Sequence, residues 1–444
     1  MKDQLIAMLK SEDEGLQMQA MFLNETSEPQ LLSDAEVVSF LRVDNWERDS
    51  INWRLLKKFR GAGFEDVEDL SETHLQSFPE SMRFLKNLKK CDLIEYQERP
   101  IPDFIGELTN LESITMYLNV DLPEYAQHSL NLLLTLPNIK ELNLIAGGYT
   151  ELPRELKQIT QLESLYLGGM AITTLPNWLA DFQNLQRFCV TRCHQLTILP
   201  EVIGKLHNLT SLITTTVPIK ELPDSLGELS NLQYLSFTTP TIRRFPPSIG
   251  QLSNLKELSL LINHAETFTL PEEIGNLQSL EKLELDHCKM KHLPTTIGGL
   301  KNLRHCSLQY NELSELPSSF FRLRRLEILN LEQTKIATIS KKFGNFRKMQ
   351  SCKLTNTNIS ELPETLRTWK ELTDLCLHGT KLHTVPDWIG QLTALKSLQI
   401  TNTAITEIPE SVGQLTNLQQ FSYTQDHCDI LLPDAVKALN IAYF

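Results

Sequence analysis

The sequence lacks the short motifs that accompany the commonest catalytic and nucleotide-binding sites. Its 444 residues contain no GxxxxGK(S/T) phosphate loop, no GxGxxG after a strand, no HExxH zinc motif and no GxSxG nucleophile turn. Each of these motifs places a nucleophile, a metal ligand or a phosphate-binding backbone at a fixed position. We therefore predict no catalytic residues, no metal site and no cofactor, and a protein that is not an enzyme.

Cysteine pairs are also absent. The eight cysteines are scattered singly and form no CxxC pair, which is the usage of a protein in a reducing compartment. Cys91, Cys306 and Cys352 occupy positions of core leucines, so we predict that they are buried and inert. Cys189 and Cys376 alternate with core residues, and we predict that they face outward from a sheet.

Long apolar runs are missing as well. The opening stretch MKDQLIAMLKSEDEG contains an apolar run of only five residues, which is shorter than the apolar core of a signal peptide. No run approaches the roughly 20 residues of a membrane-spanning helix. These features predict a cytoplasmic protein that does not insert into a membrane.

The sequence also lacks clusters of positive charge. The chain has 42 basic and 55 acidic residues, a formal net charge of -13, and no stretch in which lysine and arginine gather. Because nucleic acid and anionic lipid are bound mainly through such clusters, we expect neither as a partner. A protein or peptide with a basic or mixed surface fits this charge better.

The main feature of the sequence is an internal repeat. Residues 221–260 contain almost two copies of it, ELPDSLGELSNLQYLSFTTPTIRRFPPSIGQLSNLKELSL. An apolar residue followed by proline recurs, mostly in steps of 23 residues, and Ser340 stands where one further proline is expected. These positions delimit about fifteen repeats of the form LPxxIGxLxNLxxLxLxxxxLxx. The boundary positions are Pro79, Pro102, Pro123, Pro153, Pro176, Pro200, Pro223, Pro246, Pro271, Pro294, Pro317, Ser340, Pro363, Pro386, Pro409 and Pro433.

The repeat joins two periodicities. The LxxLxL part, as in Leu255, Leu258 and Leu260, ends in the alternation of a short strand with leucines on one face. The following proline suits the first turn of a short helical segment, and the glycine after isoleucine, such as Gly250, suits a bend on the return path. A single coil leaves its leucines in water, so successive coils must stack with their strands parallel.

This repeat resembles the leucine-rich repeat superfamily, particularly its LP-containing class of 23 residues, over roughly residues 75 to 433. The resemblance implies an α/β fold: a curved solenoid with a parallel sheet on the concave face and helical or 3-10 turns on the convex face. We predict an N-terminal helical cap over 1–74, the solenoid over 75–433 and a short C-terminal cap over 434–444. The family shares a shape and varies its partners, so the resemblance indicates the fold more strongly than the function.

Two departures from the repeat carry structural predictions. The step from Pro123 to Pro153 is 30 residues, and its segment PEYAQHSLNLLLTL predicts a longer helix. The position after the strand, which in the family holds an asparagine bonded to the backbone, becomes threonine in the C-terminal half, and we expect the hydroxyls to reach backbone groups too. The residues at this position are Asn119, Asn263, Asn311, Thr334, Thr357, Thr380 and Thr403, with Cys193 and Cys288 elsewhere.

The two ends of the chain depart from the repeat. Ser11 followed by Glu14, and Ser33 before Glu36, have the spacing of helix starts, which indicates a helical segment over 1–74. A helical domain there would cover the leucines and the strand edge at an open solenoid end. After Pro433, the residues DAVKALNIAYF predict a short helix over the last repeat, or alternatively an apolar end that pairs with another molecule. We expect a monomer.

The residues between the core leucines of each strand form the concave surface, and these positions are available for binding. The stretch from residue 257 to 333 mixes carboxylates, a lysine, imidazoles and a tyrosine with two apolar residues that we predict to be exposed, as interfaces commonly do. A second group lies earlier in the chain. The candidate partner-binding residues are Glu257, Leu261, Ile262, Lys282, Glu284, Asp286, His287, His305, Tyr310 and Glu332, with Tyr166, Arg187 and Arg192 as the second group.

Several functional alternatives remain at this level. His287 and His305 invite a metal hypothesis, but they fall at opposite ends of neighbouring strands, so we interpret them as exposed polar residues. Cys428 before Asp429 resembles the catalytic cysteine region of bacterial leucine-rich repeat ubiquitin ligases only faintly, and we predict a buried repeat position. The sequence favours a protein-interaction scaffold. The alternatives are the substrate-recognition subunit of an enzyme complex, or an exported receptor or effector for a host protein or glycan.

Overall fold

The protein is described from a computed structural model of the chain. The described residues are 2–9, 20, 68–70, 85–91, 101–238, 241–262, 267–423, 430–439 and 441–443. The chain divides into two compact units, Met1–His194 and Gln195–Phe444. Each unit is described by itself.

The first unit contains a helix near the start of the chain and a row of parallel strands. Each strand pairs with the strand of the next coil, in sequence order. Short 3-10 helices and one longer α-helix connect the strands. The elements are α1 (Lys2–Leu9), β1 (Lys90–Cys91), η4 (Asp103–Glu107), β2 (Ser113–Tyr117), α6 (Pro123–Leu133), β3 (Glu141–Ile145), η5 (Arg154–Gln158), β4 (Ser164–Gly168), η6 (Asn177–Asp181) and β5 (Arg187–Thr191).

The second unit repeats the same strand and 3-10 turn. Its strands also pair in parallel and in sequence order. The elements are η7 (Glu201–Lys205), β6 (Ser211–Thr215), η8 (Asp224–Glu228), β7 (Tyr234–Thr238), η9 (Pro247–Gln251), β8 (Glu257–Leu261), η10 (Glu272–Asn276), β9 (Lys282–Asp286), η11 (Ile297–Gly299), β10 (His305–Ser307), η12 (Phe320–Arg322), β11 (Ile328–Asn330), η13 (Lys341–Asn345), β12 (Ser351–Lys353), η14 (Glu364–Thr368), β13 (Asp374–Cys376), η15 (Asp387–Gln391), β14 (Ser397–Gln399), η16 (Glu410–Gln414), β15 (Gln420–Ser422), α7 (Asp434–Lys437) and β16 (Ala442–Tyr443).

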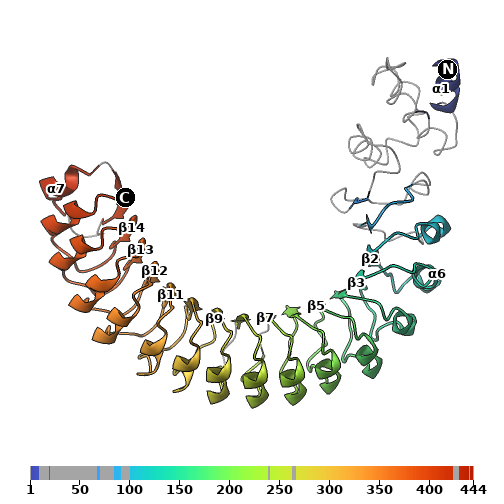
Figure 1. Cartoon of the computed structure of the whole chain (residues 1–444), viewed down its shortest axis with the longest axis horizontal. Helices are drawn as coiled ribbons and strands as arrows, with labels where there is room; N and C mark the ends of the chain where they lie inside the picture. The colour runs from blue at the N-terminus through green and yellow to red at the C-terminus, as the bar shows by residue number, and fades with distance from the viewer. Residues whose placement is uncertain are drawn as a thin grey trace. The chain divides into compact units, whose positions relative to one another are not determined.

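Within each unit the strands lie on one side and the 3-10 helices on the other, as Figure 1 shows. Alternate strand residues enclose the core between these two layers: Leu258 and Leu260 of β8 are at most 1% exposed, while Glu257 and Leu261 face outward. This is the parallel-sheet solenoid that the leucine spacing predicts, and the fold class is confirmed.

In most of the described repeats the proline lies immediately before a 3-10 helix. Pro200 and Pro246, for example, precede η7 and η9 with φ of -75° and -67°, values to which the pyrrolidine ring already restricts the chain. Ser340, which replaces the proline before η13, accepts a hydrogen bond from the Lys342 amide at 3.3 Å through its hydroxyl. A capping side chain thus takes the place of ring rigidity in this coil.

The glycines after isoleucine have a role different from the predicted bend. They lie inside the 3-10 helices without positive φ and face the following coil. A Cβ atom on Gly204 would lie 2.5 Å from the Ser225 carbonyl oxygen. Such a distance leaves no room for a side chain, so glycine permits the close stacking of neighbouring turns.

The expected bonds from the position after the strand are present where the structure describes them. Asn311 spans two coils: its Oδ1 accepts from the Met290 amide at 2.9 Å, and its Nδ2 donates to the carbonyls of Leu285 and Leu308 at 2.7 and 2.8 Å. The hydroxyls of Thr334, Thr357, Thr380 and Thr403 each donate to the carbonyl three residues earlier. The threonine bonds therefore stay within one coil. Asn263 lies outside the described residues.

The two irregular repeats are explained by local packing. The long step after Pro123 forms the predicted longer helix, α6, whose Ala126, Leu130 and Leu133 are buried. In the KKFG repeat, Phe343 packs against Phe321 with ring centroids 5.4 Å apart. Phe343 also accepts a hydrogen bond at its carbonyl from the Trp369 indole, at 3.0 Å. Aromatic rings fill the core there in place of leucine and isoleucine.

The described cysteines behave as predicted. Cys91, Cys306 and Cys352 are buried, whereas Cys189 and Cys376 are half-buried on the outer face of the sheet. Burial raises the pKa of the Cys306 thiol and raises that of Cys352 to about 12, so both remain protonated. Cys428 lies outside the described residues.

The C-terminal residues form more than the predicted short helix. Helix α7 is followed by β16, which pairs in parallel with β15 through Ala442 and Gln420. The segment therefore begins a further coil, because its spacing continues that of the repeat. The predicted helix starts at Ser11 and Ser33 lie outside the described residues. Of the helices that the structure describes, none combines the length and apolar character that crossing a bilayer requires.

Candidate functional site

The outward side chains of the second unit form three rows across its sheet, because neighbouring strands pair in the same register. The first row runs through Glu257, Lys282, His305, Ile328, Ser351, Asp374, Ser397 and Gln420. The second runs through Ser259, Glu284, Ser307, Asn330, Lys353, Cys376, Gln399 and Ser422. The third row includes Leu261 and Asp286.

The predicted binding residues of β8 to β10 come together in an ion-pair network. Lys282 Nζ lies 3.1 Å from Glu284 Oε1 and 4.0 Å from Glu257 Oε2. His305 Nε2 lies 3.8 Å from the same oxygen of Glu284. We call Glu257, Lys282, Glu284, Asp286, His305 and Glu332 the charged patch. It carries four carboxylates against one ammonium, so its surface has an excess of negative charge.

Asp286 is held in place by neutral donors. The Ser307 hydroxyl donates to its Oδ1 at 2.7 Å, and Gln309 Nε2 donates to its Oδ2 at 2.8 Å. Gln309 in turn accepts from Asn330 Nδ2 at 3.1 Å. This chain of bonds fixes the carboxylate without neutralising it, which leaves its charge available at the surface.

His305 titrates in a partly buried position. Burial lowers its pKa from 6.5, the nearby Glu284 carboxylate opposes this shift, and Lys282 reinforces it. The imidazole is therefore neutral at pH 7. It adds a hydrogen-bonding group to the patch and no positive charge.

An aromatic step adjoins the charged patch. His287 and Tyr310 follow the ends of their strands with φ of 58° and 57°, in the left-handed region. Their rings stack with centroids 4.1 Å apart and an interplanar angle of 9°. Tyr310 remains 42% exposed and Leu261 40% exposed. The step and Leu261 give the patch apolar contact area beside its charges.

Ile262 is a correction to the sequence analysis. It was predicted to be exposed beside Leu261, but it is fully buried. Unlike His287 at the equivalent position of the next coil, Ile262 has no positive φ. Its backbone therefore continues the strand alternation and points the side chain into the core with Leu258 and Leu260. A β-branched side chain strongly disfavours the left-handed conformation.

The second predicted group lies in the first unit. Arg187 Nη2 makes an ion pair with Glu141 Oε1 at 2.6 Å, across the intervening strand β4. The Tyr166 ring lies over Gly168, where a Cβ atom would come within 2.8 Å of its Cε1. Arg192 is exposed in the left-handed conformation, with φ of 54°. The arginine charge at 187 is thus already partnered by a carboxylate.

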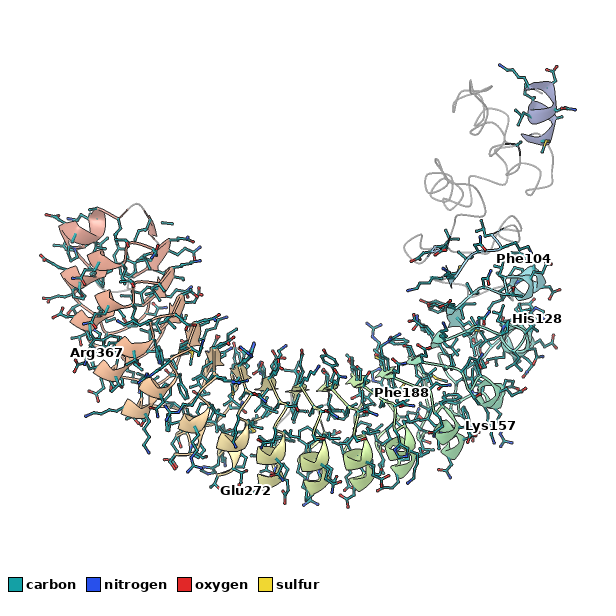
Figure 2. The ribbon with its side chains drawn as sticks, in the orientation of Figure 1. Phe104, His128, Lys157, Phe188, Glu272 and Arg367 are labelled. Atoms are coloured by element: carbon teal, nitrogen blue, oxygen red, sulfur yellow. The ribbon has the colours of Figure 1, made fainter. Side chains whose placement is uncertain are left out.

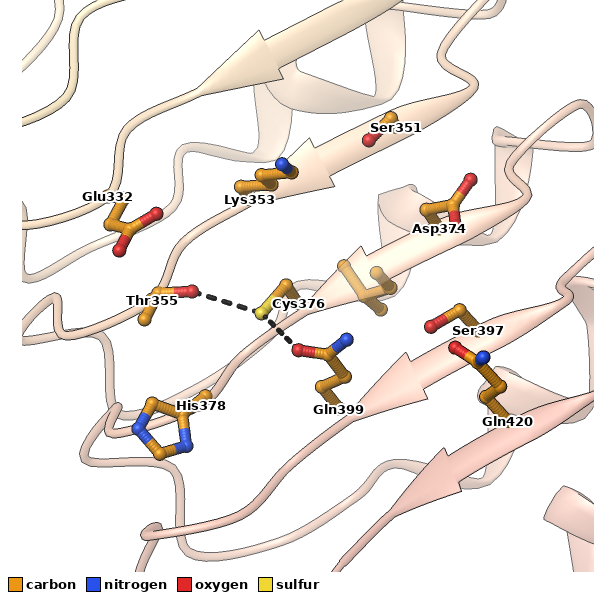
Figure 3. A pocket seen from close by; sticks show the side chains of 11 residues that line it. Glu332, Ser351, Lys353, Thr355, Asp374, Cys376, His378, Ser397, Gln399 and Gln420 are labelled. Atoms are coloured by element: carbon orange, nitrogen blue, oxygen red, sulfur yellow. Dashed lines mark hydrogen bonds between the residues drawn. The ribbon is translucent and has the colours of Figure 1, made fainter. Parts of the chain in front are cut away.

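A polar hollow on β12 to β15 was not predicted from the sequence. Its volume is about 600 Å³, and Figure 3 shows it from close by. We call it the hollow. It is lined by Glu332, Ser351, Lys353, Thr355, Asp374, Leu375, Cys376, His378, Ser397, Gln399 and Gln420.

The floor of the hollow is a chain of hydrogen bonds around Cys376. Its Sγ lies 3.0 Å from Thr355 Oγ1 and 3.0 Å from Gln399 Oε1. His378 Nδ1 lies 2.6 Å from the Thr401 hydroxyl. Because the Oε1 of Gln399 accepts from the thiol, its amide NH2 is left as a donor. The arrangement presents polar groups without an acid, base and nucleophile aligned for a reaction.

Among the described residues, His287 and His305 are not grouped with other side chains that could bind a metal ion. His287 stacks on Tyr310 after its strand, and His305 opens the next strand. Over the described ranges, no three histidine, cysteine, aspartate or glutamate side chains are grouped as metal ligands.

Comparisons with known families agree with the repeat. A model described as leucine-rich repeat region matches residues 212–292 and 323–436, and a model described as leucine rich repeat matches residues 278–336. Together they cover the strands that carry the charged patch and the hollow.

Solved structures with the same arrangement extend the comparison. A leucine-rich repeat protein of Leptospira interrogans is 27% identical, with a TM-score of 0.65, over 88% of this chain and 98% of that one. Toll of Drosophila, solved in the Toll–Spatzle complex, is similar at 16% identity and a TM-score of 0.65, over 81% of this chain and 53% of that one. The TLR13–ssRNA13 complex gives 20% identity and a TM-score of 0.61, over 81% and 60%.

The last two likenesses concern the fold alone, whereas the family models match the repeat sequence itself. The spaced leucines, the stacked parallel strands and these matches lead to one conclusion. The chain belongs to the leucine-rich repeat superfamily.

Proposed function

We propose that this chain is a non-enzymatic, cytoplasmic interaction scaffold whose sheet face in the second unit binds a protein or peptide of basic or mixed charge. Leucine-rich repeat proteins generally mediate protein–protein interactions, and Toll, one of the similar structures, was solved in complex with Spatzle. The proposal adds the face, the residues and the charge of the partner.

The observation that carries the proposal is the charged patch beside the aromatic step. The patch contains four carboxylates and one lysine, which pairs with two of them, and Tyr310 and Leu261 are exposed beside it. Interfaces combine a few aromatic or apolar anchors with a polar surround, and complementary charge accelerates association. A partner with lysine or arginine side chains meets both requirements. The same excess of negative charge disfavours RNA, the ligand in the TLR13–ssRNA13 complex.

Affinity purification with matched variants tests this proposal. The patch variant is Glu257→Lys with Glu284→Lys, and the control is Glu273→Lys with Glu410→Lys on the 3-10 side, which changes the net charge equally. The wild type and the control are expected to retain the same proteins, and the patch variant is expected to lose at least one of them.

Loss of binding must be distinguished from failure of a variant to fold. Glu257→Gln with Glu284→Gln serves as a milder variant, and thermal unfolding identifies any variant that fails to fold. Equal retention of all partners by a folded patch variant contradicts the proposal. Loss by the control alone would move the binding surface to the 3-10 side.

A further inference from the structure

The hollow lies beside the charged patch on the same sheet and shares only Glu332 with it. Its volume of about 600 Å³ is within the range of ligand sites, and all its lining residues except Leu375 and Cys376 have charged, amide, hydroxyl or imidazole side chains. A ligand there is recognised through charge and hydrogen bonds. None of the residues that line it is a phenylalanine, tyrosine or tryptophan, and the one ring in the lining, that of His378, has its Nδ1 2.6 Å from the Thr401 hydroxyl.

Lys353 distinguishes the hollow from the rest of the face. Lys282, the lysine of the charged patch, is neutralised by Glu284 and Glu257. Lys353 is exposed, and within the part of the chain that the structure describes it makes no ion pair. Its ammonium group is therefore available to an anionic group of a ligand.

The neighbours of Lys353 favour a carboxylate as that group. The amides of Gln399 and Gln420 and the hydroxyl of Ser397 line the same space and supply neutral donors. One ammonium with neutral donors matches the single charge of a carboxylate, which accepts several hydrogen bonds at once. A phosphate group would bring more negative charge than this one lysine can offset.

Two carboxylates flank Lys353 and require a cation in the ligand. Figure 3 shows Lys353 between Glu332 and Asp374. Lys353 pairs in register with Cys376, two residues beyond Asp374 on the adjacent strand. Strand spacing and rise then place the Cα atoms of Lys353 and Asp374 about 8 Å apart. A positive group a few bonds from a ligand carboxylate can reach Asp374 while the carboxylate contacts Lys353.

We infer that the hollow binds an α-carboxylate together with the basic side chain of the same residue, as presented by a peptide chain that ends in lysine or arginine. The carboxylate contacts Lys353 and the amide donors, and the basic side chain contacts Asp374. This inference rests on the proposed function, since the partner is taken to be a polypeptide. Free lysine and free arginine offer the same chemistry.

Calorimetric titration of the full chain with short N-acetylated peptides tests the inference. A peptide ending in lysine with a free carboxylate is expected to bind, and its C-terminal amide at least tenfold more weakly. Replacing the last lysine by glutamine is expected to weaken binding similarly. Tighter binding of the peptide than of free lysine identifies a chain end as the ligand, and equal binding identifies the free amino acid; either result supports the shared chemistry.

Variants locate the binding in the hollow. Lys353→Met is expected to abolish measurable binding, and Asp374→Asn to remove the preference for lysine over glutamine. Lys282→Met, which removes the ion-paired lysine of the charged patch, is expected to leave the affinity unchanged. Unfolding temperatures near that of the wild type confirm that the variants fold.

Three results would overturn the inference: no binding at millimolar peptide, equal binding of the amidated peptide, or unchanged binding by Lys353→Met. None of them bears on the charged patch, because the patch variant of Glu257 and Glu284 contains no residue of the hollow. The two proposals therefore fail separately.

Discussion

Gly250 lies so close to Glu273 of the next coil that a Cβ atom on the glycine would come within 2.6 Å of the glutamate carbonyl oxygen. The obstacle is backbone, which cannot rotate away as a side chain can. Gly250→Ala is therefore expected to lower the free energy of unfolding by about 2 kcal/mol, as overpacked substitutions commonly do.

The matched control is Gly147→Ala. A Cβ atom there has nothing within 4 Å, and its φ is not positive, so the substitution is expected to be neutral or slightly stabilising. Urea unfolding of both variants measures the difference. Equal stability of the two would show that coil stacking does not require the glycine.

Asn311 and Thr334 occupy the same position of successive repeats but make different numbers of bonds. Asn311→Ala leaves the buried Met290 amide and two carbonyls without their partner, and a loss of about 3 kcal/mol is expected. Thr334→Val removes one bond, to the Leu331 carbonyl, and a loss of about 1 kcal/mol is expected. Thermal unfolding checks the order, and a larger loss at Thr334 would contradict it.

Glu272 joins two coils on the side of the 3-10 helices, where Figure 2 labels it. Its carboxylate accepts from the amides of Thr295 and Thr296 at 3.1 and 3.0 Å. These bonds, led by that from the Thr295 amide, lower its pKa below 4.5. The stability it contributes is therefore present above about pH 4.5 and is lost as the pH falls through the lowered pKa.

Glu272→Gln is expected to cost about 1 kcal/mol at pH 7, because the group is exposed and water screens its charge. The difference from wild type should narrow below pH 4. Glu273→Gln, at the adjacent exposed position, is expected to have little effect. Denaturant unfolding at several pH values measures both, and a difference that stays constant with pH would contradict the assignment.

His305 makes the stability depend on pH closer to neutrality. Because burial lowers its pKa from 6.5, the folded chain binds the proton less tightly than the unfolded chain. Its contribution to stability is complete above about pH 6.5 and decreases as the pH falls toward the lowered value. Glu284, Asp286 and Glu257 oppose this shift, and Lys282 adds to it.

His305→Gln is expected to reduce the loss of stability between pH 7.5 and 5.5. The measurement is the difference in unfolding free energy between wild type and variant at the two pH values, which cancels the other histidines. An identical pH dependence in the two proteins would show that His305 does not contribute to it.

The sequence predicted the fold well because the leucine spacing admits only one way to bury the leucines. It also predicted α6 and the bonded threonines. Ile262 was placed wrongly because the left-handed residue that ends most strands, such as His287, is absent at that position. The local sequence around Ile262 does not show whether the residue after the strand has a positive φ.

The functional surface was only partly predictable. The alternation of strand residues identifies Glu284 and Asp286 as outward facing, and these side chains do come together. The stack of His287 on Tyr310 depends on backbone angles in two coils. The hollow depends on how side chains from four neighbouring strands and the residues after them pack beside one another, so residues such as Lys353 and Gln399 carry no local signal in the sequence.

Hydrogen exchange of the chain with a captured partner tests the central claim most directly. We predict slower exchange in strands β8 to β11 and in the residues after them, including His287 and Tyr310, with unchanged exchange in the 3-10 helices η9 to η12. Protection confined to the 3-10 helices, with the strands unaffected, would contradict the claim that the sheet face binds the partner.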